Sequence, residues 1–275
     1  MRLSPRHPRY ASLVVRARLA AFCRTGVVVP EGLIAHGRAE AFDYLLGERS
    51  LPSARRAERV AAEWLRTARR PVVSVNGNVA ALAADVIARL ERARPGLAVE
   101  VNLFHRSARR AELVARVLRA AGVRRVLGVR PTARIPSLSS DRARVDRNGI
   151  YIADVCLVPL EDGDRAEALR AIGKKVISVD LNPLSRTSRA ADLPIVDELT
   201  RALRHIAEGL ERARRRPRRK GFLVFDAAGA RRAALATIRR RLRDPSLARP
   251  PRGRPRRQAS GRAARERSDR SHRTR

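Results

Sequence analysis

Short apolar runs alternate with amphipathic stretches along the middle of the chain. The apolar runs, such as "VISVD", predict strands at 71–75, 98–103, 124–129, 154–158, 175–179 and 193–196. Between them, apolar residues at helical spacing predict helices at about 79–93, 107–121, 164–172 and from 197 to about 213. Strands that are apolar throughout are typical of parallel sheets covered on both faces. We therefore predict an α/β fold with a mostly parallel sheet and flanking helices.

The two ends of the chain have other patterns. The first 70 residues predict a helical segment, with one stretch ending at Gly26, one beginning at Ala39 and ending near Gly47, and one beginning at Pro52. We expect this segment, 1–70, to form a single domain with residues 71–244. Within that domain, "RRRPRRKG" predicts a linker and "ARRAALATIRRRL" a further helix. Residues 245–275 have almost nothing to bury and predict a disordered Arg-rich tail.

The charge of the chain is strongly basic and unevenly spread. It carries 61 Lys and Arg against 27 Asp and Glu, a net charge of +34 that is typical of nucleic-acid-binding proteins. Residues 211–275 alone hold 24 Lys and Arg against 5 Asp and Glu, and three lysines occur in the whole sequence. A general bias toward arginine would produce the same numbers. The tail also lacks the aromatic residues that stack on single-stranded bases. Nucleic-acid binding by the tail stays open as an alternative function.

Composition also bears on the location of the protein. No run approaches the roughly 20 apolar residues that span a bilayer, and the N-terminus, interrupted by Pro and Arg, does not resemble a secretory signal. Cys23 and Cys156 are too few for a disulfide framework or a thiolate metal site. We expect a cytoplasmic protein without a membrane partner.

Polar loops follow several of the predicted strands. Ligands of open parallel sheets bind beyond the carboxyl ends of the strands. After strand 71–75 come Asn76, Gly77 and Asn78, which could donate amide hydrogens while the glycine lets a phosphate approach the backbone. A plain Asn-Gly turn with an asparagine helix cap would explain the same residues.

The segments "DLNPLSRT" and "LEDGDR" are two further candidates. Asp180 could accept hydrogen bonds from a ribose or base, Arg186 could pair with phosphate and Thr187 supplies a hydroxyl, although this is also good turn chemistry. In the second segment the carboxylates of Glu161, Asp162 and Asp164 could hold Mg²⁺ or attract a substrate ammonium, or could cap the next helix.

A cluster of His36, Arg38, Glu40 and Asp43 lies upstream, before and at the start of a predicted helix. It could provide phosphate contacts or acid–base groups. The sequence contains no HExxH, no His/Cys zinc spacing, no Walker P-loop and no GxSxG elbow. His205 falls on a predicted helix and indicates no site. These residues predict an α/β enzyme that binds phosphate-bearing ligands.

Six ordered motifs then resemble one family. They are "HPRYASL", "GLIAHGRAEAFDYLLGER", "PVVSVNGNVAAL", "EVNLFHRS", "ADVCLVPLEDGDRAEAL" and "GKKVISVDLNPLSRT". Together, from about residue 5 to 210, the chain resembles the archaeal phosphopantothenate synthetases, also called 4-phosphopantoate–β-alanine ligases. The resemblance implies a Rossmann-like sheet and a homodimer. It also implies an ATP-dependent ligase of coenzyme A biosynthesis, which joins (R)-4-phosphopantoate to β-alanine through an acyl adenylate and releases AMP and diphosphate.

The resemblance also implies roles for individual residues. The expected ATP contacts are Arg16, Arg38, Asp180, Leu181, Asn182, Arg186, Thr187, Glu198 and Leu199, the last two standing where the family has Asn-Ile. Catalysis is expected from His36 as base, from Arg38 and from Asp164, with Mg²⁺ on the phosphates. The expected substrate contacts are Asn76, Asn78, Arg106 and Asp162. The metal ligands are not indicated.

Two features lie outside the family pattern. The region around "RRRPRRKGFLV" is shortened, and the Arg-rich extension is additional. A Rossmann-type oxidoreductase is the remaining alternative. It is disfavoured because no GxGxxG follows any predicted strand.

Overall fold

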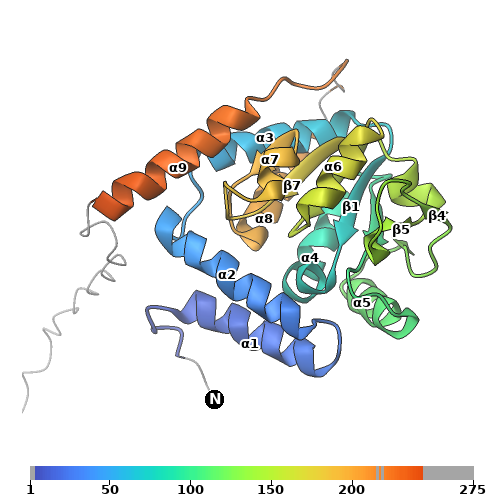
Figure 1. Cartoon of the computed structure of the whole chain (residues 1–275), viewed down its shortest axis with the longest axis horizontal. Helices are drawn as coiled ribbons and strands as arrows, with labels where there is room; N and C mark the ends of the chain where they lie inside the picture. The colour runs from blue at the N-terminus through green and yellow to red at the C-terminus, as the bar shows by residue number, and fades with distance from the viewer. Residues whose placement is uncertain (1–3, 215–216, 218–219, 244–275) are drawn as a thin grey trace, which may run out of the picture.

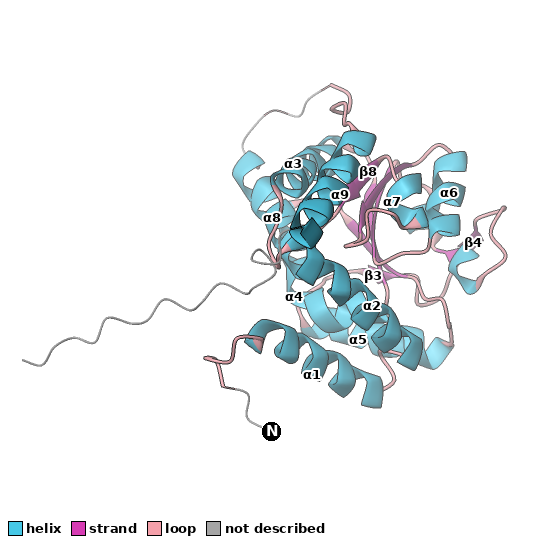
Figure 2. Ribbon diagram, turned by 60° about the vertical axis from the view of Figure 1, so that its left-hand side comes forward, coloured by secondary structure: helices cyan, strands magenta, loops and turns pink. Residues whose placement is uncertain are grey.

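The computed structural model describes residues 4–214, 217 and 220–243. Their main feature is a six-stranded parallel sheet with the order β3-β2-β1-β6-β7-β8 (Figures 1 and 2). The strands are β1 (Pro71–Val75), β2 (Ala98–Val101), β3 (Val126–Leu127), β6 (Val155–Pro159), β7 (Lys175–Val179) and β8 (Leu193–Ile195). Counted along the chain within this sheet, the order is 3-2-1-4-5-6, that of the Rossmann fold. The predicted fold class is confirmed.

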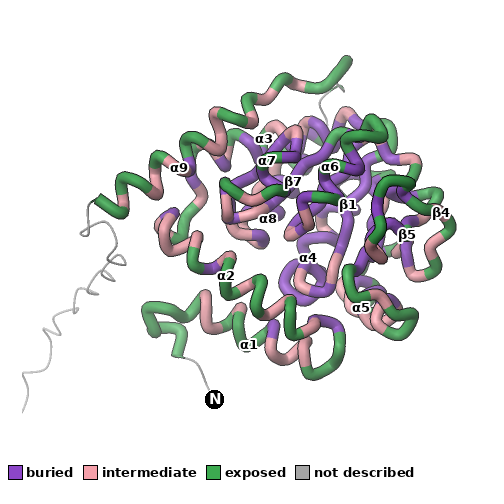
Figure 3. The backbone as a smooth tube through the Cα atoms, viewed as in Figure 1, coloured by how far each residue is buried: buried purple, intermediate pink, exposed green. Residues whose placement is uncertain are grey.

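Alternate residues of the strands supply two separate cores. On one face Val73, Leu157 and Ile177 pack against helices α3 (Pro52–Thr67), α4 (Gly77–Ala93), α5 (Ala108–Ala120) and α8 (Leu199–Ala213). On the other face Val72 and Cys156 pack toward α6 (Gly163–Ala171). The sheet is therefore buried on both sides, as Figure 3 shows by the buried strands under an exposed outer surface.

Helix α2 lies between α1 and α9, the first and last described helices. Helix α1 (Tyr10–Arg24) packs on α2 (Pro30–Leu46), and α2 packs on α9 (Ala227–Arg243) (Figure 1). Before α9, the indole N–H of Trp64 donates to the carbonyl of Leu223 at 2.8 Å, and the Trp64 ring lies 5.7 Å from that of Phe222. These contacts hold the chain after α8 against α3.

Several elements differ from the sequence prediction. Helix α2 begins at Pro30, nine residues before the predicted start at Ala39. Proline is favoured in the first turn of a helix, and the additional helical residues pack on α1. Strand β3 is shorter than 124–129. The helix α7 (Arg186–Ala190), a 3₁₀ turn (Asp141–Ala143), a π turn (Arg147–Tyr151) and the antiparallel pair β4 (Ala133–Arg134) and β5 (Arg144–Val145) were not predicted.

The predicted tail, 245–275, lies outside the described residues, as does most of the predicted linker. None of the helices in the described residues combines the length and the apolar character needed to cross a membrane.

Candidate active site

A cavity of about 680 Å³ lies at the carboxyl ends of the strands, under helix α2. Its walls come from the segments that follow β1, β2, β6, β7 and β8. Between β1 and β6 the strand order reverses direction, and such a reversal opens a crevice where ligands of this sheet type bind. The volume is within the range of small-molecule sites, about 300–1,000 Å³.

Twelve of the fifteen predicted site residues line this cavity. They are His36, Arg38, Asn76, Asn78, Asp162, Asp180, Leu181, Asn182, Arg186, Thr187, Glu198 and Leu199. Arg16, Arg106 and Asp164 do not line it.

The loop after β7 is held in shape by its own side chains. The Asp180 carboxylate accepts the Asn182 N–H at 2.9 Å, and the Asn182 side-chain oxygen accepts the Leu184 N–H at 2.9 Å. Thr187 donates its hydroxyl to the Glu161 carbonyl at 2.6 Å, which ties this loop to the end of β6. Burial raises the pKa of Asp180, while a hydrogen bond from Ser185 opposes that rise. The loop is thus preorganised.

Two exposed guanidinium groups lie at this end of the cavity. The Arg186 side chain is 68% exposed and its nearest carboxylate, Glu167, is 3.5 Å away. Arg38 makes no hydrogen bond or salt bridge within the described part of the chain and is exposed. Because these charges are weakly engaged, they are available to an anionic ligand.

Along the strand order, the segment after β2 lies on the other side of β1 and β6 from the β7 loop, and this opposite end of the cavity is also cationic. The Arg110 guanidinium donates to the carbonyls of His105 at 2.6 Å and Val27 at 3.2 Å, so it is held by neutral groups. Burial, followed by repulsion from Arg142, lowers the pKa of Arg110. Arg142 lies 5.9 Å over the Phe104 ring. Two guanidinium groups that repel each other within a cavity wall form a favourable place for an anion.

A buried ion-pair cluster holds the Arg142 side chain in place. The Glu161 carboxylate bonds both Arg142 and the fully buried Arg165, which also donates to the Ser74 hydroxyl at 3.0 Å. Asp162 lies 3.1 Å from the Arg142 guanidinium, and burial raises its pKa against the opposing effect of Arg142. Of the three predicted carboxylates, Glu161 and Asp162 line the cavity, but Glu161 is held by two arginines and is therefore structural, so Asp162 is the one left to contact a ligand.

Asn76 has both ends of its side chain occupied by the protein. Its oxygen accepts the Val79 N–H at 3.0 Å and caps α4, and its amide donates to the Leu160 carbonyl at 2.9 Å. The cap alternative explains this residue, and its side chain joins β1 to β6 at the reversal of strand order. The Asn78 amide donates to the Gly32 carbonyl at 2.8 Å and holds α2 over the cavity.

His36 and Arg38 lie inside α2 rather than before it, which corrects the predicted position. Burial lowers the pKa of His36 despite the neighbouring Glu40 carboxylate, which favours the neutral imidazole. Arg16 does not reach the cavity; it bonds Glu40 at 2.8 Å beside a smaller hollow between α1 and α2 that His36 also lines.

Comparison with known proteins gives the family. Residues 53–241 match the model of the family described as phosphopantothenate/pantothenate synthetase. The chain belongs to this family. A 4-phosphopantoate–β-alanine ligase of Methanospirillum hungatei is 55% identical over 73% of this chain and 82% of its own length. Ligases of the same name from Methanosarcina mazei and Thermococcus onnurineus are 54% and 51% identical, each over 74% of this chain and over 79% and 77% of their own lengths.

The family membership confirms the resemblance and leaves individual roles to the geometry. The match to the phosphopantothenate/pantothenate synthetase model contains the cavity segments from β1 to the start of α8. Besides Arg16, two predicted residues lie outside the cavity lining. Arg106 donates to the carbonyls of Gly128 and Val129, and Asp164 is exposed in the first turn of α6, outside the lining.

Sequence reasoning missed Arg110 and Arg142. Arg110 could have been found, because it follows the helix cap Ser107 by one turn at the carboxyl end of β2. Arg142 lies in an irregular segment of short turns, where no periodicity indicates which side chains point inward.

Proposed function

We propose that this chain is an ATP-dependent ligase that joins 4-phosphopantoate to β-alanine and forms 4′-phosphopantothenate, AMP and diphosphate, a step of coenzyme A biosynthesis in the cytoplasm. The family and the names of its relatives support this reaction. The observation that carries it is a single cavity with cationic groups at both ends, since the reaction needs two phosphate-bearing substrates together.

The reaction would proceed in two steps. The phosphopantoate carboxylate attacks the α-phosphorus of ATP, forming an acyl–oxygen–phosphorus link and releasing diphosphate. The neutral amine of β-alanine then attacks the acyl carbon, the amide forms, AMP leaves and one proton is released. No protein nucleophile takes part. Rate enhancement would come from positioning the two substrates and from cations that neutralise phosphate charge.

The two ends of the cavity suggest where each substrate binds. The loop from Asp180 to Thr187, with Glu198 and Leu199, would bind the nucleotide, and Arg38 and Arg186 would face its phosphates. Arg110 and Arg142 would bind the 4-phosphate of phosphopantoate, in place of Arg106 and of Asn76. The carboxylate of phosphopantoate would then lie between the ends, toward the α-phosphate.

The β-alanine amine needs a carboxylate and a base near the middle of the cavity. We assign the ammonium to Asp162 rather than Asp164, because Asp162 lines the cavity. His36, with its lowered pKa, is suited to accept the proton of that ammonium. Arg16 is assigned no contact within one chain.

Mg²⁺ fits this cavity mainly as the partner of ATP. Among the carboxylates of the lining, Glu161 is neutralised by two arginines, and Asp180 accepts bonds from Asn182 and Ser185. The phosphates and water would therefore supply most of the oxygen ligands, as is usual for Mg²⁺. When bound, the ion spreads the negative charge that develops on the phosphates.

A homodimer is the expected assembly. Tyr10 and Val14 on α1 and Ile34 on α2 are exposed, Ile34 to 72%, which supports burial against a second copy. Light scattering after gel filtration would measure the mass.

The experiment that tests the function is a product assay. The full chain is incubated with ATP, Mg²⁺, 4-phosphopantoate and β-alanine, and AMP and 4′-phosphopantothenate are measured by mass spectrometry. We expect equal amounts of both products and no amide when either organic substrate is omitted. ATP binding without amide formation would refute the assigned substrates, and ADP in place of AMP would refute the acyl adenylate.

A further inference from the structure

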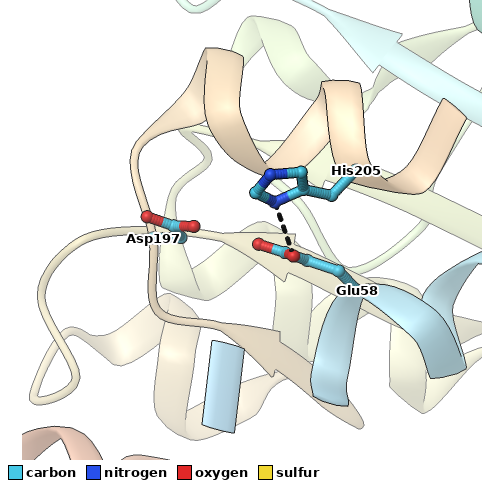
Figure 4. Close-up of side chains that lie close together, drawn as sticks. All are labelled: Glu58, Asp197 and His205. Carbon is cyan, nitrogen blue, oxygen red and sulfur yellow. Dashed lines mark hydrogen bonds and ion pairs between the residues drawn. The ribbon is translucent and has the colours of Figure 1, made fainter. Parts of the chain in front are cut away.

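Three ionisable side chains meet away from the cavity lining (Figure 4). Glu58 comes from α3, Asp197 from the connection between β8 and α8, and His205 from α8. The His205 Nδ1 atom lies 2.8 Å from the Glu58 Oε2 atom. One ligand atom from each of the three residues can be chosen so that all lie within 4.8 Å of one another.

Each carboxylate has one oxygen without a partner. Glu58 is 1% exposed and Asp197 is 2% exposed. Within the described residues, the Glu58 Oε1 and Asp197 Oδ2 atoms are buried and accept no hydrogen bond. The second oxygen of Asp197 accepts from Arg201 and from the Glu198 N–H. Buried polar atoms without a partner are rare, since each costs about 1–3 kcal/mol, and they call for an explanation.

When all of its carboxylates are ionised, this cluster holds more negative than positive charge. The carboxylates of Asp43, Glu58 and Asp197 face two guanidinium groups, Arg55 at 3.5 Å from Glu58 and Arg201 on the other two. Burial and then a side-chain hydrogen bond with Asp197 raise the pKa of Glu58 to about 9, so near neutral pH a proton lies between these two carboxylates. A divalent cation held by the same oxygens would replace that proton and relieve the repulsion between two buried carboxylates side by side.

We propose that Glu58, Asp197 and His205 bind one divalent transition-metal ion of the zinc class. Imidazole nitrogen with carboxylate oxygen is a ligand set that suits such ions, whereas Mg²⁺ prefers oxygen ligands alone. The ion would use the two unpartnered oxygens and one ring nitrogen. His205 is partly exposed, its side chain to 24%, so solvent can reach the site and complete the coordination.

The site would link three segments of the chain and stabilise one wall of the cavity. These segments are α3, α8 and the connection between β8 and α8, where Asp197 is followed directly by the lining residues Glu198 and Leu199. The ion would therefore stabilise the fold locally and take no part in the ligase chemistry. This inference is independent of the proposed reaction, because metal uptake is measured without substrates.

The test uses the full chain, stripped with EDTA and kept free of nucleotides. Zn²⁺ binding is measured by calorimetry and by metal analysis after dialysis, with Mg²⁺ in a parallel titration. Co²⁺ is added separately, because its visible absorption reports on nitrogen and oxygen ligands. The variants are His205→Ala and Asp197→Asn, with His7→Ala as the control, since His7 is an exposed histidine away from the cluster. Circular dichroism shows whether each variant is folded.

We expect one Zn²⁺ per chain, an affinity at least about 10-fold weaker in His205→Ala and Asp197→Asn, and no change in His7→Ala. The Co²⁺ bound to the unmodified chain should show d–d bands that are shifted from those of aqueous Co²⁺ and that change in His205→Ala. This readout stands even if Asp197→Asn does not fold. Absence of Zn²⁺ uptake, equal uptake by His205→Ala, or Mg²⁺ binding in preference to Zn²⁺ would overturn the proposal.

Discussion

Two buried carboxylate clusters lie close to the cavity walls, and they neutralise charge in opposite ways. Glu161 lies between the guanidinium groups of Arg142 and Arg165, so its charge is fully compensated within the chain. Glu58 lies beside a second carboxylate, Asp197, and each keeps a buried oxygen without a partner. Since burying an unpaired charge is costly, the Glu161 carboxylate is fully paired as it stands, although Arg142 and Arg165 keep buried N–H groups without a hydrogen-bond partner within the described residues, whereas the Glu58 and Asp197 carboxylates would be paired by a cation.

Glu100 shows a third arrangement. It is fully buried on β2, and its two oxygens accept the N–H groups of Asp146 at 2.9 Å and Ile150 at 2.6 Å. These bonds hold the irregular segment 146–151 against the sheet. Burial nevertheless raises the pKa of Glu100 to about 7, because no cation bonds it in the described part of the chain.

The largest effect is expected from breaking the Glu161 cluster. Glu161→Gln leaves the buried Arg165 charge without its carboxylate, which should lower the free energy of unfolding by about 3–5 kcal/mol. Urea unfolding followed by circular dichroism measures this loss. Glu167→Gln is the control, because its partner Arg186 is exposed and such pairs contribute about 0–1 kcal/mol. Equal losses in the two variants would contradict the role of Glu161.

Glu100 should make stability depend on pH. The pKa of Glu100 is raised in the folded chain, from 4.5 to about 7. Its contribution to the free energy of unfolding is therefore fully present below pH 4.5 and is lost as the pH rises through about 7. The loss amounts to about 3 kcal/mol. Urea unfolding at several pH values, compared between the unmodified chain and Glu100→Gln, should show the difference between the two changing across this window. Parallel curves would refute the raised pKa.

Substitution of Arg110 tests whether the two ends of the cavity bind different substrates. Arg110→Ala should raise the KM for 4-phosphopantoate about 30-fold, since hydrogen bonds to charged groups contribute about 1.5–3 kcal/mol, and should leave the KM for ATP within about twofold. Arg109→Ala is the matched control, because the neighbouring Arg109 is exposed and does not line the cavity. If both KM values rise equally in Arg110→Ala, the assignment of the two ends is wrong.

The smallest effect concerns Asn76. Asn76→Ser keeps an oxygen that can cap α4 but loses the bond to the Leu160 carbonyl, so we expect a loss of about 1 kcal/mol in unfolding free energy and an unchanged KM for either substrate. Asn76→Ala, which also loses the cap, should lose about 1 kcal/mol more. A tenfold higher KM for phosphopantoate at unchanged stability would restore Asn76 as a substrate contact.

The sheet could be predicted because its strands are buried on both faces. Every residue of "PVVSV" and "VCLVP" is buried, and such continuous apolar runs are visible in the sequence. The elements that were missed have no comparable pattern. Strands of two residues and the five-residue α7 are held by contacts with distant parts of the chain, such as the hydroxyl bond from Thr187 to Glu161.

The candidate site divides in the same way. The rule for carboxyl ends of parallel strands selected the loops that line the cavity, and the family resemblance selected residues within them. Neither could show which polar atoms are already occupied. The Asn76 side chain is already hydrogen-bonded to the Val79 N–H and the Leu160 carbonyl. The second of these bonds depends on the distance between β1 and β6, which the sequence does not show. The cluster of Glu58, Asp197 and His205 joins positions up to 147 residues apart, beyond the reach of any local motif.

Because Trp64 contacts the segment before α9, tryptophan fluorescence reports on the position of that segment. Trp64 is the single tryptophan of the sequence, and its indole N–H is bonded to the Leu223 carbonyl. Tryptophan emission therefore comes from one known place, where the C-terminal segment lies on α3. Release of that segment would hydrate the indole and shift the emission to longer wavelength. One fluorescence spectrum can thus follow the docking of the segment before α9 on α3.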